Sequence, residues 1–379
     1  MHNMIIVNPF RYGKIVDEPY FIDRVNELKQ IKNDLISCQN LIIYSPRRYG
    51  KTSLIIKVLK EFKKENYYVI YIDFFKITSQ RKFIEDYSKE ILRNQTFFRK
   101  AISKFRSLVR GLTAFVSFND KGEPSFSISF QTNVNLSDSL TDVLNLPSKL
   151  DKNKKWIIVF DEFQEIEKLN GENFEKFLRS VIQFHENISY VFMGSKTHLV
   201  LNMFSRQNRA FYKFGKLVKI KKIDKKEFKE YIINKFSEGE FDCMNNLADN
   251  IIQITNNIPY YVQFLASEVW NEGLNNNRKI TEKQLDNAFE NILTNQQDYF
   301  LQLYEYLSSY QKKVLLALAR SREQIFSEEF QRTHNLGPIS STQRAIEKLE
   351  KTGIIEKNEG NIEFTDPFFP SFLRLRGFA

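Results

Sequence analysis

The segment at residues 41–52, LIIYSPRRYGKT, constrains the fold more than any other part of the chain. A short apolar run breaks there into a basic loop, and residues 53–62 then place apolar side chains at helical spacing. A strand, a loop and a helix are predicted in that order. A loop that opens a helix points backbone N–H groups and a positive dipole end at one spot, which suits a polyphosphate. The segment therefore predicts a site for a nucleoside triphosphate.

Individual residues of this loop have predictable roles. Gly50 lets the backbone approach the ligand closely, Lys51 can reach the β- and γ-phosphates, and the hydroxyl of Thr52 can bind Mg²⁺. Ser45 stands where the consensus G-x-x-x-x-G-K-[ST] has its first glycine, and a small residue can make that turn. An ordinary exposed turn is the alternative, but the flanking strand and helix argue against it. The predicted nucleotide-binding residues are Ser45, Pro46, Arg47, Arg48, Tyr49, Gly50, Lys51, Thr52 and Ser53.

Two acidic residues follow a second apolar run at residues 156–164, WIIVFDEFQ. An apolar run without polar alternation is typical of a central parallel strand. Asp161 at its end is predicted to hold Mg²⁺, and Glu162 to orient or deprotonate the water that attacks the triphosphate. A buried strand with a solvated acidic end is the alternative for this segment alone. Its pairing with Lys51 and Thr52 favours the metal and base roles.

Length and composition restrict the class of protein. A chain of 379 residues should form two or three domains, and no apolar stretch reaches the ~20 residues that span a bilayer. The start of the chain lacks the organisation of a secretory signal, so we expect a cytoplasmic protein with no membrane partner. Two distant cysteines and four scattered histidines indicate neither a disulfide framework nor a zinc site.

The net charge of +10 is unevenly distributed along the chain. Residues 1–110 contain 22 Lys and Arg against 11 Asp and Glu, whereas residues 301–379 contain 11 against 10. The basic excess thus belongs to the part with the predicted nucleotide site, where it can face phosphate, face a partner or simply be solvated. It does not lie where a simple DNA-binding interpretation would place it.

The coarse order of elements predicts an α/β core. Strands are predicted at five apolar runs that alternate with helical patterns, which implies a parallel sheet covered on both faces. Ligands of such sheets bind beyond the carboxyl ends of the strands, where both motifs lie. The alternating segment SFSISF at residues 125–130 and the turn residues 119–122 predict a β-hairpin insertion within residues 112–130. The predicted strands are residues 41–44, 67–74, 156–160, 188–193 and 216–223.

The remainder of the chain predicts a helical lid and a small mixed domain. Asp224 followed by Glu227 is a helix-start signal, and only helical periodicities follow to about residue 300, so an all-α lid is predicted. Three helices and a short strand pair near the C-terminal end form a winged helix-turn-helix. The predicted helices are 311–320, 327–333 and 341–351, the strand pair lies around 358–365, and the domains are 1–223 (core), 224–300 (lid) and 301–379 (winged helix).

Short motifs are spaced along nearly the whole chain. They are Asn8-Pro9-Phe10, Phe21-Ile22-Asp23-Arg24, residues 45–54, Ile72-Asp73, Asp161-Glu162, Gly194-Ser195, Arg209-Ala210-Phe211-Tyr212, Asn257-Ile258-Pro259-Tyr260 and Thr365-Asp366-Pro367-Phe368-Phe369. With these motifs the chain resembles the prokaryotic P-loop ATPases called archaeal ATPases, which are relatives of the AAA+ and STAND groups. The resemblance implies a P-loop core of the ASCE type, a helical lid and a C-terminal winged helix. It also implies ATP rather than GTP, together with Mg²⁺.

The resemblance implies roles for further residues. Ser195 or Lys196, after the fourth strand, would read the γ-phosphate as a sensor, with a simple strand-terminating turn as the alternative. Arg209, or else Arg206, would be an arginine finger for a neighbour's γ-phosphate, because a delocalised cation stabilises transition-state charge. The residues that would close over the adenine, with core packing as the alternative, are Phe21, Ile22, Pro259 and Tyr260.

Two departures from the family pattern concern the lid. Asn257 replaces the glycine of a Gly-x-Pro signature, and no arginine follows Pro259 until Arg278. A lid arginine of the AAA+ type is therefore not apparent in the sequence. This favours a STAND-like switch, in which ADP holds a closed state and ATP an open state, over a processive motor.

We therefore expect an Mg²⁺-dependent ATP-binding protein that hydrolyses ATP slowly and whose nucleotide state repositions the lid and the winged helix. One alternative is a nucleotide-binding regulator that binds duplex DNA, although the near-neutral charge of residues 301–379 argues against strong binding. Another is an interaction scaffold in defence or signalling, with a client protein or further copies of the chain as partners. In the DNA-binding alternative, the residues at base edges would be Ser341, Thr342, Gln343 and Arg344.

Overall fold

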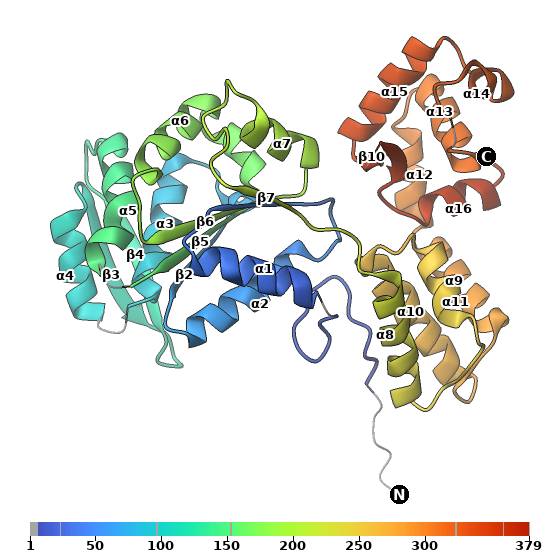
Figure 1. The fold of residues 1–379 in the computed structure, drawn as a ribbon, viewed down its shortest axis with the longest axis horizontal. Helices are drawn as coiled ribbons and strands as arrows, with labels where there is room; N and C mark the ends of the chain where they lie inside the picture. Colours follow the sequence, from blue (N-terminus) through green and yellow to red (C-terminus); the bar gives the residue numbers. More distant parts are fainter. Residues whose placement is uncertain are drawn as a thin grey trace, which may run out of the picture. The chain divides into compact units, whose positions relative to one another are not determined.

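A five-stranded parallel sheet forms the centre of the first of two structural units (Figure 1). The computed structural model describes residues 7–22, 24–95, 98–151, 154–322, 324–358 and 360–378. The core unit contains Arg24–Lys221, and the second unit combines the chain before Arg24 with the chain from Lys222 onward. The chain thus crosses between the units twice, whereas the predicted division was sequential, with the core at residues 1–223.

The sheet has the strand order β2-β5-β6-β1-β7, and every neighbouring pair is parallel. The predicted α/β fold with a parallel sheet is confirmed. Every residue of β5 and β6 is buried, as expected for strands covered on both faces. β6 lies between β1 and β5, so the strands that carry the two motifs are not neighbours. The strands are β1 (Leu41–Tyr44), β2 (Tyr68–Asp73), β5 (Trp156–Asp161), β6 (Ile188–Gly194) and β7 (Lys216–Lys219).

Helices cover both faces of this sheet. Figure 1 shows α1 and α2 on one side and α6 on the other. Apolar residues at helical spacing give each helix a buried stripe, such as Phe83, Tyr87 and Ile91 of α3. Phe83 and Tyr87 contact Phe160 of β5 in an aromatic core. The helices are α1 (Val25–Ile36), α2 (Lys51–Lys64), α3 (Gln80–Arg93), α5 (Leu136–Leu150), α6 (Gly171–Ile182) and α7 (Thr197–Ser205), with short 3-10 helices η1 (Phe74–Lys76) and η2 (Phe163–Leu169).

An insertion of one helix and one hairpin lies between α3 and α5 in the sequence. The predicted β-hairpin is confirmed: Leu112 pairs with Phe130, and the turn contains Gly122 at φ +74°. Period-two alternation gives the hairpin one apolar face, which packs on α3 and α4, and one face exposed to solvent. The elements are α4 (Phe98–Leu108), β3 (Leu112–Phe118) and β4 (Pro124–Phe130).

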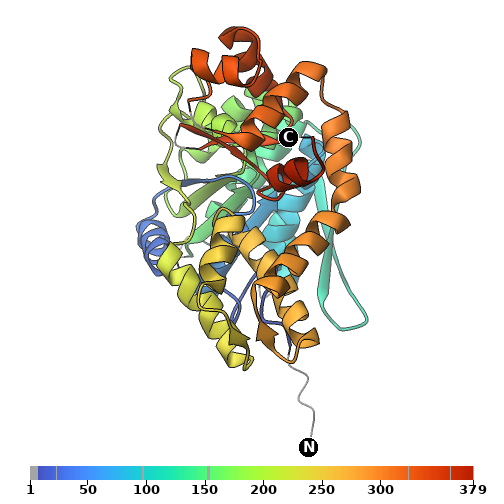
Figure 2. The same ribbon diagram turned by 90° about the vertical axis from the view of Figure 1, so that its right-hand side faces the viewer.

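The lid of the second unit consists mainly of helices (Figure 2). Asp224 caps the first of them, as predicted, because its carboxylate accepts from the N–H of Lys226 at 2.8 Å. A parallel pair of two-residue strands, β8 and β9, is added to the predicted all-α lid. Strands of two residues are too short to leave a periodic pattern in the sequence. The elements are α8 (Lys225–Glu238), β8 (Asp242–Cys243), α9 (Leu247–Ile254), α10 (Pro259–Asn275), β9 (Lys279–Ile280) and α11 (Glu282–Asn295).

The segment of residues 7–22 belongs to the second unit and packs on α10. Nδ2 of Asn8 donates to the carbonyl and the hydroxyl of Ser267 at 3.1 and 3.0 Å. Phe10 is buried, with its ring centroid 6.0 Å from that of Trp270. The first motif of the chain is therefore an anchor that holds the N-terminal segment on the lid.

A winged helix-turn-helix follows the lid. Its three predicted helices and its strand pair are present, and a further helix, α16, follows them. Thr342 is completely buried, and its hydroxyl donates to Oε1 of Gln331 at 2.6 Å. The hypothesis that Thr342 faces base edges is therefore wrong. The elements are α12 (Gln297–Glu305), α13 (Ser309–Arg320), α14 (Glu328–Thr333), α15 (Ile339–Lys351), β10 (Ile355–Asn358), β11 (Asn361–Phe364) and α16 (Phe369–Leu375).

No helix in the described part of the chain combines the length and the apolar character needed to cross a membrane. The longest of these helices, α10, has 17 residues.

His185 is a partly buried residue of the core unit, and its two hydrogen-bond partners suit the neutral imidazole. Its Nε2 lies 2.9 Å from Oδ1 of Asn145 and its Nδ1 lies 2.7 Å from the hydroxyl of Tyr190. A neutral ring can donate to the first and accept from the second. Burial accordingly lowers the pKa of His185 from 6.5 to about 4.

The core unit should lose stability as the pH falls from 6.5 towards about 4, because the unfolded chain then binds a proton at His185 that the folded chain excludes. After allowance for partial exposure, we expect a loss on the order of 1–2 kcal/mol. Urea denaturation of a His185→Gln variant should show a smaller loss over this pH range. His198→Gln, which changes an exposed histidine, is the control. An unchanged pH dependence in His185→Gln would contradict the assignment.

Candidate functional site

The predicted phosphate-binding loop connects β1 to α2. Gly50 has φ +85°, a left-handed conformation that glycine adopts without strain. Lys51 is only 6% exposed, and its Nζ donates to the carbonyls of Ser45 and Pro46 at 2.9 and 3.1 Å. The buried ammonium is thus held by the loop's own oxygens, next to the first N–H groups of α2. The loop presents a cation and a helix N-terminus together, which is what a polyphosphate requires.

The other predicted loop residues differ in exposure. Arg47 and Arg48 are exposed, and the Arg47 guanidinium lies 5.6 Å from the ring centroid of Phe75. Tyr49 is buried, and its carbonyl accepts from Arg24 at 2.8 Å. The two arginines are therefore accessible to solvent, whereas Tyr49 fixes the loop to the chain before α1.

Asp161, at the end of β5, lies beside the first turn of α2. The hydroxyl of Thr52 donates to Oδ2 of Asp161 at 3.3 Å, and the hydroxyl of Tyr71 from β2 donates to the same oxygen. Burial raises the pKa of Asp161, while the hydrogen bond from Tyr71 acts in the opposite direction. Two hydroxyls and one carboxylate therefore meet at a single point.

The oxygen atoms of Thr52 and Asp161 are suitable ligands for Mg²⁺. In nucleotide sites Mg²⁺ takes one or two oxygens from the protein and completes its octahedron with phosphate oxygens and water. The predicted ligands Thr52 and Asp161 supply two oxygens that are already within hydrogen-bonding distance of each other. Carboxylate and hydroxyl oxygens are the ligands that a hard divalent cation such as Mg²⁺ prefers.

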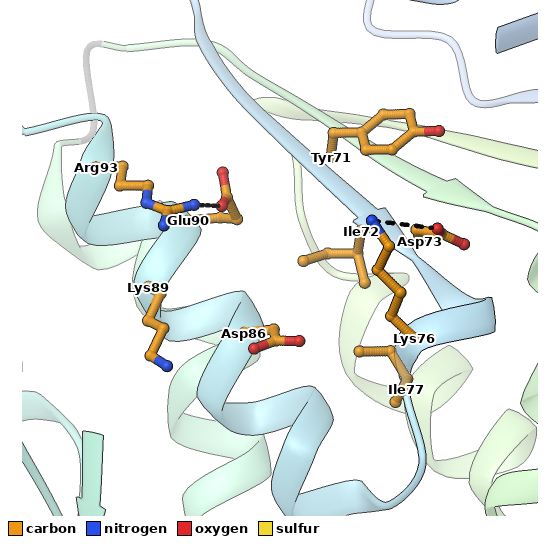
Figure 3. Close-up of a pocket in the computed structure, with 9 residues that line it drawn as sticks. All are labelled: Tyr71, Ile72, Asp73, Lys76, Ile77, Asp86, Lys89, Glu90 and Arg93. Carbon is orange, nitrogen blue, oxygen red and sulfur yellow. Dashed lines mark hydrogen bonds and ion pairs between the residues drawn. The ribbon is translucent and has the colours of Figure 1, made fainter. Parts of the chain in front are cut away.

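Tyr71 also borders a cavity of about 300 Å³ between β2 and α3 (Figure 3). The charged side chains there form ion pairs, some within the lining, as Lys76 does with Asp73 at 3.7 Å, and some with residues beside it, as Asp86 does with Lys82 at 2.7 Å. Sequence reasoning missed Tyr71, because a tyrosine within an apolar strand is normally a packing residue. The residues that line the cavity are Tyr71, Ile72, Asp73, Lys76, Ile77, Asp86, Lys89, Glu90 and Arg93.

The carboxylate of Glu162 is bound by the residue that follows β6. Its Oε2 accepts from the N–H of Ser195 at 3.2 Å, from the Ser195 hydroxyl at 2.7 Å and from Nε2 of Gln164 at 2.5 Å. Lys196, the other sensor candidate, pairs instead with Glu165 at 2.9 Å. Ser195 and Glu162 therefore form one hydrogen-bonded group, and Lys196 contacts a different acid.

Gln164 is a second residue of this group that sequence reasoning missed. It is 2% exposed and lies against the end of β6. A Cβ atom added to Gly194 would lie 2.3 Å from Oε1 of Gln164 and 2.4 Å from Cγ2 of Val200, so a larger residue would displace the amide from its position beside Glu162. The Gly194-Ser195 motif thus has a physical reason, since its glycine accommodates Gln164 and its serine binds Glu162.

Arg209 is bound within the core unit. Its guanidinium contacts Glu175, which is completely buried, through two nitrogens, and it also donates to Glu167 at 3.2 Å. The pairing compensates a carboxylate that would be costly to bury alone. Arg206 is exposed. The finger role of Arg209 stays a prediction and requires the guanidinium to leave Glu175, whereas Arg206 would need no such change.

The residues predicted to close over the adenine belong to the second unit. Pro259 is the first residue of α10, and the ring of Tyr260 packs edge-on against Tyr12 at 5.8 Å. Asn257 has φ +54°, which asparagine tolerates, and donates to the carbonyl of Ile223 at 2.8 Å. The neighbouring Asp23 lies outside the described residues. The residues whose adenine-binding role stays a prediction are Phe21, Ile22, Pro259 and Tyr260.

A family of ATPase domains found predominantly in Archaea matches residues 21–265. This chain belongs to that family. As an archaeal ATPase it binds a nucleotide in its P-loop and is an ATP-hydrolysing enzyme, as predicted. A probable winged helix domain matches residues 298–375, so the C-terminal winged helix is confirmed. No curated protein sequence matches this chain.

Solved structures share the fold of this archaeal ATPase at low sequence identity. A Walker-type ATPase of Pyrococcus abyssi is similar over 97% of this chain and 99% of its own, at 18% identity and a TM-score of 0.65. The ORC2 protein of Aeropyrum pernix, in ADPNP-ADP complexes, is similar over 98% and 100%, at 13% identity and a TM-score of 0.54. At these identities the likeness establishes the fold.

A Tyr71→Phe variant should bind the metal more weakly, because it lacks the hydroxyl that orients Asp161. The Mg²⁺ concentration for half-maximal ATP hydrolysis should rise about tenfold. ADP affinity in EDTA should match the parent, since the loop and α2 are untouched. A Mn²⁺ titration followed by EPR in the presence of ADP measures metal affinity without turnover. Tyr68→Phe, in the same strand, is the control. If the parent, Tyr71→Phe and Tyr68→Phe bind Mn²⁺ with equal affinity, Tyr71 is only a packing residue.

Proposed function

We propose that this archaeal ATPase is an Mg²⁺-dependent enzyme of slow turnover whose nucleotide state changes the arrangement of its two units. The observation that carries the proposal is the position of β6 between β1 and β5. Parallel strands end at a common edge, so the loop after β1, the carboxylates after β5 and Ser195 after β6 surround one point. A triphosphate bound to the loop would meet all of them.

Each residue at this edge has a part in the proposed reaction. Lys51 exchanges the loop carbonyls for β- and γ-phosphate oxygens. Thr52 and Asp161 hold Mg²⁺, which when bound neutralises charge on the phosphate oxygens. Glu162 orients the attacking water and takes its proton during in-line attack. Ser195 holds the carboxylate of Glu162 in place and would sense loss of the γ-phosphate through these hydrogen bonds.

The hydrogen bonds of Glu162 support a slow basal rate. Three donors converge on its Oε2, and two of them come from Ser195. These three hydrogen bonds hold the carboxylate in one orientation, toward Ser195 and Gln164. To take the proton of the attacking water through Oε2, Glu162 would exchange one of these bonds for that water. A signal that displaces Ser195 or Gln164 would raise the rate, which suits a switch.

Arg24 supports coupling between the phosphate loop and the two units. It begins the core unit after the first crossing and is 5% exposed. Its guanidinium donates to the carbonyl of Tyr49 in the loop at 2.8 Å and to that of Lys221, just before the second crossing, at 3.1 Å. Movement of the loop on binding a γ-phosphate would therefore reach both connections at once.

Duplex DNA binding through the winged helix stays a second hypothesis. Gln343 and Arg344 are exposed on α15, whereas Thr342 is buried. The nearly balanced charge of residues 301–379 supplies little attraction for phosphates. A scaffold role, with a client protein or a homo-oligomer as partner, also stays a hypothesis.

Variants at Lys51 and Glu162 should distinguish the binding of ATP from its hydrolysis. Lys51→Ala should abolish ATP binding measured by calorimetry, because the loop loses its only buried cation that can reach the phosphates. Glu162→Gln should bind ATP like the parent and lower kcat by roughly 10²- to 10⁴-fold. Glu186→Gln, at an exposed position before β6, is the control. Hydrolysis at the parent rate in Glu162→Gln would exclude Glu162 as the base.

Loss of Arg24 should uncouple the units while leaving nucleotide binding. Dyes attached at Lys64→Cys and Glu282→Cys, in a chain whose native cysteines are serine, report the distance between the units by energy transfer. The transfer efficiency should differ between ADP and a non-hydrolysable ATP analogue in the parent, and this difference should disappear in Arg24→Gln. Arg93→Gln, an exposed arginine of α3, should behave as the parent. A nucleotide-dependent change that persists in Arg24→Gln rules out this coupling route.

A further inference from the structure

The insertion between α3 and α5 is strongly basic. Residues 98–130 contain six Lys and Arg against two Asp and Glu, and α4 itself contains no acid. Its apolar residues Ala101, Ile102 and Phe105 are buried. The opposite side of the helix is exposed and positive. The exposed basic residues of α4 are Arg99, Lys100, Lys104 and Arg106.

An aromatic ring continues this basic surface onto the hairpin. Phe115 of β3 is 48% exposed, although the alternate positions Leu112 and Ala114 are buried. It is therefore on the solvent face of the hairpin. Its cross-strand partner Ser127, the diagonal neighbours Ser125 and Ser129, and Ser117 in the same strand are all small and polar. The ring contributes little to the core, and the small side chains beside it on the sheet leave it about half exposed.

Arg106 joins the two parts of the surface. Its guanidinium carbon lies 5.8 Å from the ring centroid of Phe115, and its NH2 group donates to the carbonyl of Ala114 at 3.3 Å. The arginine thus reaches from α4 to the outer face of β3. A cation beside an exposed aromatic ring is a combination that binds both a phosphate and the face of a base. Figure 1 places α4, β3 and β4 beyond the β2 edge of the core sheet.

We propose that the exposed side of α4 and the outer face of the hairpin, here called the insertion surface, bind single-stranded nucleic acid. The α4 cations Arg99 and Lys100 would contact the phosphates, and Phe115 would stack on a base. A duplex would satisfy the cations but would hide its base faces from Phe115. An anionic membrane fits less well, because membrane-surface helices insert an apolar face and that of α4 is already buried. The proposal is independent of the winged helix.

The test measures binding of labelled oligonucleotides to the full chain by fluorescence anisotropy. Single-stranded DNA and RNA of about 20 nucleotides and a duplex of equal length are compared over a range of salt concentrations. We expect either single strand to bind more tightly than the duplex. Arg99→Ala with Lys100→Ala should reduce the slope of log K against log salt by about 1.4. Phe115→Ser should lower affinity about tenfold and leave that slope unchanged.

Matched controls separate these effects from misfolding and from general charge. Lys63→Ala with Lys64→Ala removes two exposed cations from α2, and Phe184→Ser removes a ring that is 75% exposed. Both should bind as the parent does, and all variants should keep the parent ATPase rate and melting temperature. The proposal is overturned if no single strand binds at low salt or if the insertion variants bind like the controls. It is equally overturned if the duplex binds as tightly and Phe115→Ser has no effect, since the surface would then attract any polyanion.

Discussion

Two opposite charges buried at one edge of a parallel sheet are the constraint on which this structure depends. Lys51 and Asp161 are 6% and 5% exposed, and each would be costly to bury without polar partners. Loop carbonyls surround the ammonium, while the hydroxyls of Thr52 and Tyr71 bind the carboxylate. The site is therefore assembled by the chain's own hydrogen bonds. Phosphate oxygens and a metal ion can replace those bonds with charge-assisted ones, which are stronger.

The strand order also places hydrogen-bond partners around Glu162, the residue that would activate water. Because β6 lies between β1 and β5, the residue after it can bind a carboxylate that follows β5. Ser195 and Gln164 then both bind Glu162, and the glycine at 194 leaves room for the amide of Gln164. The geometry of the proposed base is thus set by its neighbours in the sheet. A conformational change that moves Ser195 or Gln164 would therefore change the rate at which Glu162 activates water.

Other contacts connect the nucleotide site with the two points at which the chain passes between its units. Arg24 joins the phosphate loop to both points at which the chain passes between its units. The N-terminal segment is anchored on the lid, so both crossings lead to the same unit. The insertion surface, by contrast, belongs to the core unit and needs no movement to be accessible. The core unit would thus carry both the ATP site and a contact for nucleic acid, whereas the second unit carries the winged helix.

The sequence by itself determined the elements whose signal is local. The P-loop, the Asp161-Glu162 pair, the parallel strands, the hairpin and the winged helix all follow from turn residues and apolar periodicity over a few residues, and the structure contains them. The tertiary structure alone decided which distant side chains meet. Tyr71 and Arg24 bind partners that are remote along the chain, Gln164 binds Glu162 only across the folded turn, and Thr342 binds Gln331 from the buried face of α15. No local pattern encodes such contacts, since they depend on strand order and on how helices pack.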